Sequence, residues 1–138
     1  MKSLRTIRLL YLVAAAYDGL LGMAFLAAGP AIYAAAGITP PNHWGYIHFA
    51  AGILAIFGLM FLMIALRPVE NRNLVPYGIM LKVCYVGTVA WHWYNGGVPD
   101  LWKYFAVADV AFALLFFWSL VPLETEADTP AAAGAEPT

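Results

Sequence analysis

Residues 74–94 read LVPYGIMLKVCYVGTVAWHWY, an apolar run that is long enough to cross a bilayer. A lysine, Lys82, lies inside this run. An ammonium group in hydrocarbon costs roughly 2.5–3.5 kcal/mol on insertion scales, so it needs a partner of opposite charge. Two acidic residues, Asp18 and Asp109, lie inside other apolar runs at a comparable depth. The sequence therefore predicts a buried Asp–Lys–Asp cluster between helices.

The composition of the chain is that of a protein with several membrane spans. Apolar residues make up 63% and charged residues 11% of the chain, whereas soluble proteins average roughly 45–50% and 25%. The charged residues occur in clumps that long uncharged stretches separate. The net charge of −1 gives no basic face for nucleic acid. We therefore expect the lipid bilayer, and no nucleic acid, as a partner.

Four apolar stretches have the length of a transmembrane helix, which is about 20 residues. They cover residues 8–28, 44–66, 74–94 and 102–121. Because the connections are short, consecutive helices should be antiparallel neighbours. The predicted fold is an all-α, integral membrane, up-down-up-down four-helix bundle, with its transmembrane domain over residues 1–121.

Prolines set the predicted ends of two of these helices. Gly29-Pro30 ends the first, unless the helix continues weakly through residues 31–37 as a short interfacial helix. Pro122 ends the fourth. Residues 122–138 are acidic and rich in Ala and Pro, and they lack an apolar stripe. We expect this tail to be disordered.

Lysine and arginine in short loops predict the orientation, because they favour the cytoplasmic side of a membrane. One side holds Lys2, Arg5, Arg8, Arg67 and Arg72. The other side holds Lys103 together with many aromatic residues. Both termini are therefore predicted to be cytoplasmic.

Helical spacing predicts which residues face the centre of the bundle. The predicted stripes are Tyr11, Ala14, Asp18, Gly22 and Phe25; His48, Gly52, Ala55 and Leu59; Gly78, Lys82, Tyr85 and Val89; and Phe105, Asp109, Phe112, Ala113 and Phe116. The predicted polar cluster is accordingly Asp18, Lys82, Asp109 and Tyr85. Its two carboxylates exceed its one ammonium, an imbalance that one bound proton would remove. Two roles stay open: an ion pair that fixes helix packing, or a site for protons or a polar headgroup.

The remaining polar candidates are three histidines, a tyrosine and a cysteine. His48 and His92 lie near the aromatic-rich interface and, with Tyr17, are predicted contacts for a ligand or lipid headgroup. His43, His48 and His92 can also be drawn as a metal site. No pair of them has the i, i+4 spacing of helical ligands and no HExxH motif occurs, so we expect no metal. Cys84 is predicted to be a small packing residue.

Several short motifs resemble those of the small four-helix bacterial membrane proteins grouped as DoxX-like. They are Tyr17-Asp18-Gly19 with Gly22, Arg67-Pro68 with Asn71-Arg72, and Asp109. The resemblance covers residues 8–121. It implies a four-helix fold in the bacterial cytoplasmic (inner) membrane. Because some relatives are linked to quinone-dependent sulfur oxidation, it also implies quinone as a ligand.

Two functional hypotheses follow. The chain contains no phosphate-binding Gly-rich loop, nucleophile elbow or CxxC motif. The first hypothesis is therefore a non-catalytic accessory or scaffold subunit without a cofactor, bound to other membrane-protein subunits through its helices and acidic tail. The alternative is a membrane redox component that binds a quinone or a lipid headgroup at the Asp, Lys, His and Tyr side chains.

Overall fold

The computed structural model describes residues 2–129 of the chain. Its elements are α1 (Lys2–Ala35), α2 (Gly45–Leu66), the short 3-10 helix η1 (Arg72–Leu74), α3 (Val75–Asn95) and α4 (Asp100–Asp128). Within the described residues there is no β-strand. Each of the four α-helices is long and apolar enough to cross a membrane. The predicted all-α class is confirmed, and the four helices are those of a multi-pass membrane protein in length and composition.

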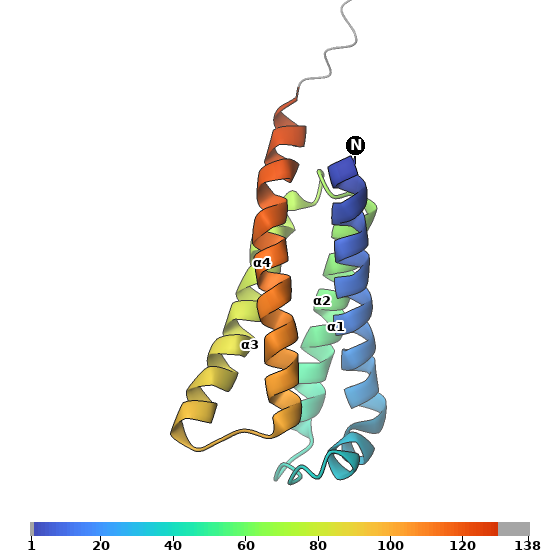
Figure 1. Cartoon of the computed structure of the whole chain (residues 1–138). Helices are drawn as coiled ribbons and strands as arrows, with labels where there is room; N and C mark the ends of the chain where they lie inside the picture. The colour runs from blue at the N-terminus through green and yellow to red at the C-terminus, as the bar shows by residue number, and fades with distance from the viewer. Residues whose placement is uncertain (1, 130–138) are drawn as a thin grey trace, which may run out of the picture.

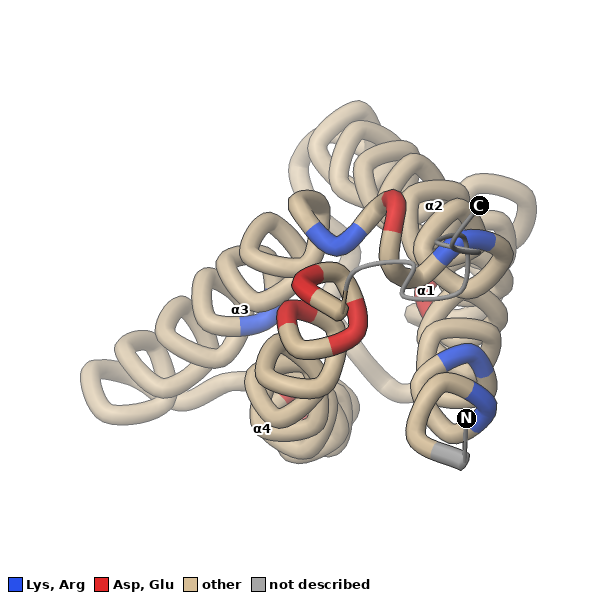
Figure 2. The backbone as a smooth tube through the Cα atoms, turned by 90° about the horizontal axis from the view of Figure 1, so that it is seen from above, with Lys and Arg blue, Asp and Glu red and all other residues tan. Residues whose placement is uncertain are grey.

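The helices run alternately along one common direction (Figure 1). The start of α1, the α2–α3 connection and the end of α4 lie at one end of the molecule, which we call the termini end. The α1–α2 and α3–α4 connections lie at the opposite end, the loop end. Figure 2 looks onto the termini end and shows charged residues of both signs at the helix ends gathered there.

The bundle consists of two helix pairs, α1 with α2 and α3 with α4. Glycines bring the first pair into backbone contact: a Cβ at Gly22 would lie 2.5 Å from the carbonyl oxygen of Ala51. A Cβ at Gly58 would lie 2.7 Å from the Cα of Gly19. Small residues permit such close approach of membrane helices. In Figure 1, α3 leans away from α2 toward the loop end, so the two pairs diverge there.

A closely packed core joins all four helices near the termini end. Its buried apolar residues are Ile7, Tyr11, Ala14, Phe61, Ile64, Ala65, Val75, Phe116 and Leu123. The Tyr11 ring stacks on Phe116 with centroids 4.8 Å apart. The Ser119 hydroxyl donates to the Phe116 carbonyl at 2.7 Å, and the Tyr11 hydroxyl lies 2.9 Å from Ser119 Oγ. Buried hydroxyls are thus hydrogen-bonded in this half.

The first helical run begins at Lys2, before the predicted start at residue 8, and reaches Ala35. Ala28 has non-helical backbone angles, φ −138° and ψ 24°, so the run consists of two helical parts that meet at a bend there. The predicted end of the first span at residue 28 thus coincides with this bend, and a second helical part continues through Ala35, as the alternative predicted. The bend has a local cause: Pro30 has no backbone N–H, and its ring crowds the carbonyl of the preceding turn.

The fourth helix continues through Pro122 to Asp128, so the prediction that it ends at Pro122 is wrong. Packing holds the helix together beyond the proline, because Leu123 is fully buried in the core. The expected disorder is therefore wrong for residues 122–128, which are helical. Residues 130–138 of the predicted tail lie outside the described residues.

The predicted inward stripe of α2 is wrong for His48, which is exposed, and for Leu59, which is 65% exposed. Its two small members, Gly52 and Ala55, are half-buried, and Ala55 packs against Gly22 of α1. The buried residues of this helix are Ala51, Gly58, Phe61, Ile64 and Ala65. On the other three helices the predicted stripes are buried or half-buried.

Candidate ligand-binding cleft

The three charged residues inside the apolar helices meet at one point. Lys82 is 0% exposed. Its Nζ donates hydrogen bonds to Asp18 Oδ1 at 2.7 Å and to Asp18 Oδ2 at 2.8 Å. The same Nζ lies 2.9 Å from Asp109 Oδ1, although the direction of approach does not make a hydrogen bond. α1, α3 and α4 thus each contribute one charged side chain to the predicted Asp–Lys–Asp cluster.

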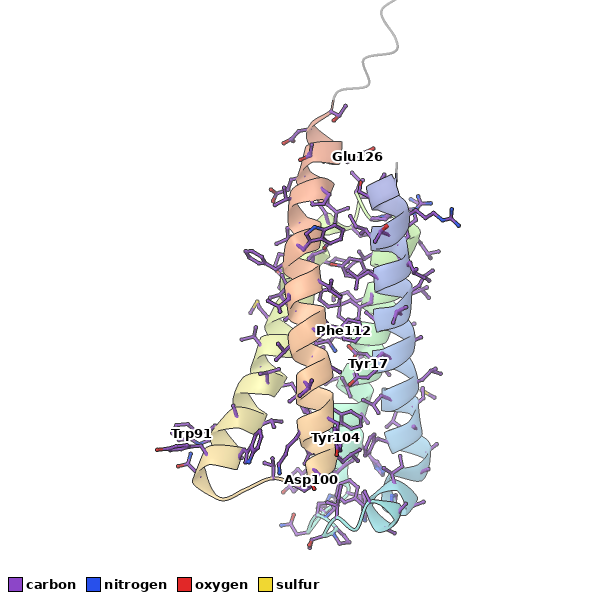
Figure 3. All side chains as sticks on the ribbon, viewed as in Figure 1. Tyr17, Trp91, Asp100, Tyr104, Phe112 and Glu126 are labelled. Atoms are coloured by element: carbon purple, nitrogen blue, oxygen red, sulfur yellow. The ribbon has the colours of Figure 1, made fainter. Side chains whose placement is uncertain are left out.

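Aromatic rings surround the ammonium group of this cluster. Lys82 Nζ lies 5.3 Å from the ring centroid of Tyr17, 5.4 Å from that of Phe112 and 5.9 Å from that of Phe61. Tyr17 and Phe112 occupy the middle of the bundle, between α1 and α4 (Figure 3). A cation over ring faces is stabilised electrostatically, and more strongly where water is excluded. The rings therefore add favourable contacts around the ammonium group of Lys82.

Two buried polar atoms at this cluster accept or donate no hydrogen bond within residues 2–129. They are the hydroxyl of Tyr17 and Oδ1 of Asp109. Asp109 is only 5% exposed. A buried polar group left without a hydrogen bond costs roughly 1–3 kcal/mol, and more when it is charged. Both groups therefore have unused hydrogen-bonding capacity that a ligand could satisfy.

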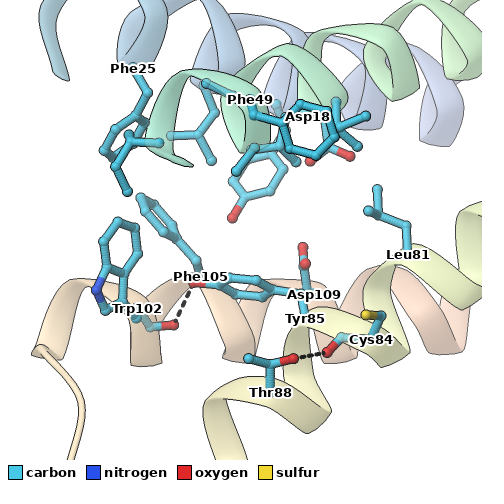
Figure 4. A pocket seen from close by; sticks show the side chains of 17 residues that line it. Asp18, Phe25, Phe49, Leu81, Cys84, Tyr85, Thr88, Trp102, Phe105 and Asp109 are labelled. Carbon is cyan, nitrogen blue, oxygen red and sulfur yellow. Dashed lines mark hydrogen bonds between the residues drawn. The ribbon is translucent and has the colours of Figure 1, made fainter. Parts of the chain in front are cut away.

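A cleft of about 390 Å³ extends from this cluster toward the loop end. It is lined by Tyr17, Asp18, Leu21, Phe25, Ile47, Phe49, Ala50, Ala51, Ile53, Leu54, Leu81, Cys84, Tyr85, Thr88, Trp102, Phe105 and Asp109. The Asp109 side chain points into the space between the two helix pairs (Figure 4). The volume falls in the range of roughly 300–1,000 Å³ that is typical of small-molecule sites. An apolar cleft with a few convergent polar groups is the usual form of such sites.

The mouth of the cleft lies on the flank of the bundle, between α2 and α3. Its exposed lining residues are Phe49, which is 73% exposed, and Ala50 on α2, with Cys84 and Thr88 on α3. The prediction that Cys84 is a packing residue is wrong, because its thiol is exposed at the mouth. The mouth is therefore lateral, on the flank of the bundle and not at either end.

Aromatic rings close the loop end of the cleft. The ring of Tyr33 packs against Phe25 with centroids 6.4 Å apart and against Trp102 with centroids 5.8 Å apart. Trp44 lies on the other side of Tyr33, at 5.2 Å. Phe25 and Trp102 both line the cleft, so this aromatic cluster separates it from the loops.

The structure separates the remaining predicted residues into two groups. Tyr17 and Tyr85 line the cleft, as a headgroup site requires. Tyr85 borders the cleft together with Asp109, and its hydroxyl donates to the Trp102 carbonyl at 3.2 Å. His48 and His92 are not among the lining residues, and both are exposed. They therefore do not border the cleft, and their contact with a lipid headgroup stays a prediction.

The three histidines also do not form a metal site. His43 Nδ1 accepts a hydrogen bond from the backbone N–H of Gly45 at 3.0 Å, at the start of α2. His48 packs near Trp44 with centroids 6.4 Å apart. Among residues 2–129, no group of three His, Cys, Asp or Glu side chains could hold a metal ion. These histidines instead lie at helix ends and on exposed surfaces near the loop end.

The α2 side of the cleft could not be found from the sequence. Its lining residues are Ile47, Phe49, Ala50, Ala51, Ile53 and Leu54. All are apolar, as is nearly all of α2, so no pattern of residue types marks the face that borders a cavity.

Comparisons with protein-family models, with curated proteins and with solved structures found no match to this chain.

Proposed function

We propose that this chain is a multi-pass membrane protein that binds an amphiphile, a quinone or a lipid, in the cleft between its two helix pairs. The polar head lies against Asp109 and Tyr17, and the apolar tail leaves through the mouth between α2 and α3. The observation that carries this proposal is the lateral cleft that ends at Asp109, a buried carboxylate whose Oδ1 accepts no hydrogen bond and which shares one ammonium with Asp18.

The proposal includes a location and an orientation. The uneven distribution of lysine and arginine supports a cytoplasmic position for the termini end, because short cytoplasmic loops are enriched in these residues. The resemblance to DoxX-like proteins supports the bacterial inner membrane and favours quinone among the possible ligands. The accessory-subunit hypothesis stays a prediction, and ligand binding in the cleft is compatible with it.

Crosslinking with photoreactive ligands tests the proposal. The full chain in lipid nanodiscs is irradiated with a photoreactive quinone or, separately, with a photoreactive phospholipid, and the modified residues are mapped by mass spectrometry. Thr88→Trp fills the mouth without altering the buried cluster. Val83→Trp, on the exposed face of the same helix, is the matched control because Val83 does not line the cleft.

We expect crosslinks to cleft-lining residues in the wild type and in Val83→Trp, and their loss in Thr88→Trp. The two ligands, tested separately, distinguish a quinone site from a lipid site. Equal labelling of all three proteins, or crosslinks confined to residues outside the cleft, would show that the cleft is not a binding site.

A further inference from the structure

The charged residues that line the cleft are both acidic. They are Asp18 and Asp109, whereas Lys82 lies behind them, is completely buried and does not line the cleft. The other ionisable groups in the lining are the hydroxyls of Tyr17 and Tyr85 and the thiol of Cys84. A ligand head in the cleft therefore meets carboxylate oxygens and hydroxyls, and no cationic side chain in the lining.

Both aspartates lie within ion-pair distance of Lys82, but the hydrogen bonds distinguish them. Lys82 donates to both carboxylate oxygens of Asp18, at 2.7 and 2.8 Å, which satisfies that carboxylate. Asp109 is close to the same ammonium but receives no hydrogen bond from it. One ammonium also cannot neutralise two carboxylates. Since buried charges are stable only when paired, Asp109 requires a second positive group or a proton.

The rest of the lining supplies aromatic surface. Six aromatic side chains border the cleft, namely Tyr17, Phe25, Phe49, Tyr85, Trp102 and Phe105. Aromatic faces attract cations, and recognition of onium groups uses several rings around the charge. A carboxylate inside an aromatic-lined space therefore matches a cation with an apolar body, in charge at the carboxylate and in apolar contact at the rings.

We infer that the cleft selects a lipophilic organic cation, whose positive group lies against Asp109 and whose apolar part contacts the aromatic lining. This inference rests on the proposed function, binding of an amphiphile in the cleft, and it favours a positively charged amphiphile over the neutral quinone considered there. An anionic head would add a third negative charge beside Asp18 and Asp109. A neutral head would supply no charge, so that only a bound proton could balance Asp109, whereas a cationic head balances it directly.

Two ions of the same shape and opposite charge test this inference. Tetraphenylphosphonium and tetraphenylborate are each added to the full chain in nanodiscs, and bound ligand is measured against empty nanodiscs of the same lipid. We expect saturable binding of tetraphenylphosphonium and none of tetraphenylborate. Asp109→Asn should weaken tetraphenylphosphonium binding at least about tenfold, which corresponds to 1.4 kcal/mol.

Asp100→Asn is the matched control, because Asp100 lies on the same helix, pairs with Lys103 and does not line this cleft. It should bind as the wild type does. Thr88→Trp provides a second test that leaves the charged cluster unchanged, and it should also abolish binding.

Equal binding of tetraphenylphosphonium to wild type and Asp109→Asn, or retained binding in Thr88→Trp, would overturn the inference. Binding of both ions would refute charge selection and still support a ligand cleft. If neither ion binds while the photoreactive quinone or phospholipid still labels the lining residues, the cation is refuted and the proposed function stands.

Discussion

Replacing Lys82 by methionine tests whether the ion cluster holds the bundle together. Methionine keeps an unbranched chain of similar length, so the substitution removes the ammonium with little change in packing volume. Lys82 is fully buried and lies within 2.9 Å of carboxylate oxygens from two other helices. After the change, Asp18 and Asp109 face each other across an apolar interior without a cation.

The expected loss of stability follows from these contacts. Removing one partner of a buried ion pair costs roughly 3–5 kcal/mol, because the remaining charge stays buried and unpaired. Lys82 donates two hydrogen bonds to a charged acceptor, each worth roughly 1.5–3 kcal/mol, which gives a sum of similar size. We therefore expect Lys82→Met to lower the free energy of unfolding by about 3–5 kcal/mol.

Neutralising the aspartates should restore most of this loss. In the triple variant Lys82→Met, Asp18→Asn, Asp109→Asn, no buried charge remains at the cluster, and replacing a whole buried charge cluster is often close to neutral. Lys103→Met is the control: its partner Asp100 is at 2.7 Å, but the Lys103 side chain is 28% exposed. Loss of such a surface pair should cost less than about 1 kcal/mol.

Reversible unfolding in mixed detergent micelles, followed by circular dichroism, measures these free energies. A Lys82→Met protein within about 1 kcal/mol of the wild type would refute the reasoning, since that is the scale of an exposed pair. If the triple variant is no more stable than Lys82→Met, the uncompensated carboxylates are not the cause of the loss of stability in Lys82→Met.

Five further variants test other contacts by the same unfolding measurement. Asp109→Asn should leave stability unchanged or increase it, because it removes the excess negative charge of the cluster. Asp18→Asn should destabilise the protein by about 1.5–3 kcal/mol, because it weakens the hydrogen bonds from Lys82. Equal effects of the two substitutions would contradict the difference in hydrogen bonding between the two aspartates. Gly58→Val should cost several kcal/mol, since its Cβ would lie 2.7 Å from the backbone of Gly19. Gly52→Ala should stabilise the protein by up to about 1 kcal/mol, because no atom lies within 4 Å of the added Cβ. Tyr11→Phe removes a buried hydrogen bond and should cost about 1 kcal/mol, and no measurable change would show that this bond contributes nothing.

The charged cluster was predictable because membrane interiors leave few alternatives. A lysine in the middle of an apolar run needs a carboxylate, and the sequence offers only Asp18 and Asp109 at that depth. Helical spacing around these residues then identified the buried faces of three helices. The same physical constraint that makes an intramembrane charge costly makes its partner identifiable.

Other features depended on packing that residue patterns do not contain. α2 has no charged residue, so nothing in its sequence distinguishes the face that contacts α1 from the face that borders the cleft. Pro122 breaks a hydrogen bond locally, but the buried Leu123 keeps the helix in place beyond it. The cleft exists because the two helix pairs diverge, and divergence is a property of the assembled bundle. His48 and His92 were predicted to lie beside a ligand from their depth along the helices, but depth does not tell which side of a helix a residue occupies.

The bend at Ala28 decides by which route a molecule can reach Asp109. Because Pro30 redirects the last turns of α1, Tyr33 lies over Phe25 and Trp102. This tyrosine, with Phe25 and Trp102, lies between the cleft and the loops. If the proposed function holds, a ligand reaches the cleft from the bilayer, so that its partitioning into lipid precedes recognition and its local concentration in the membrane governs occupancy.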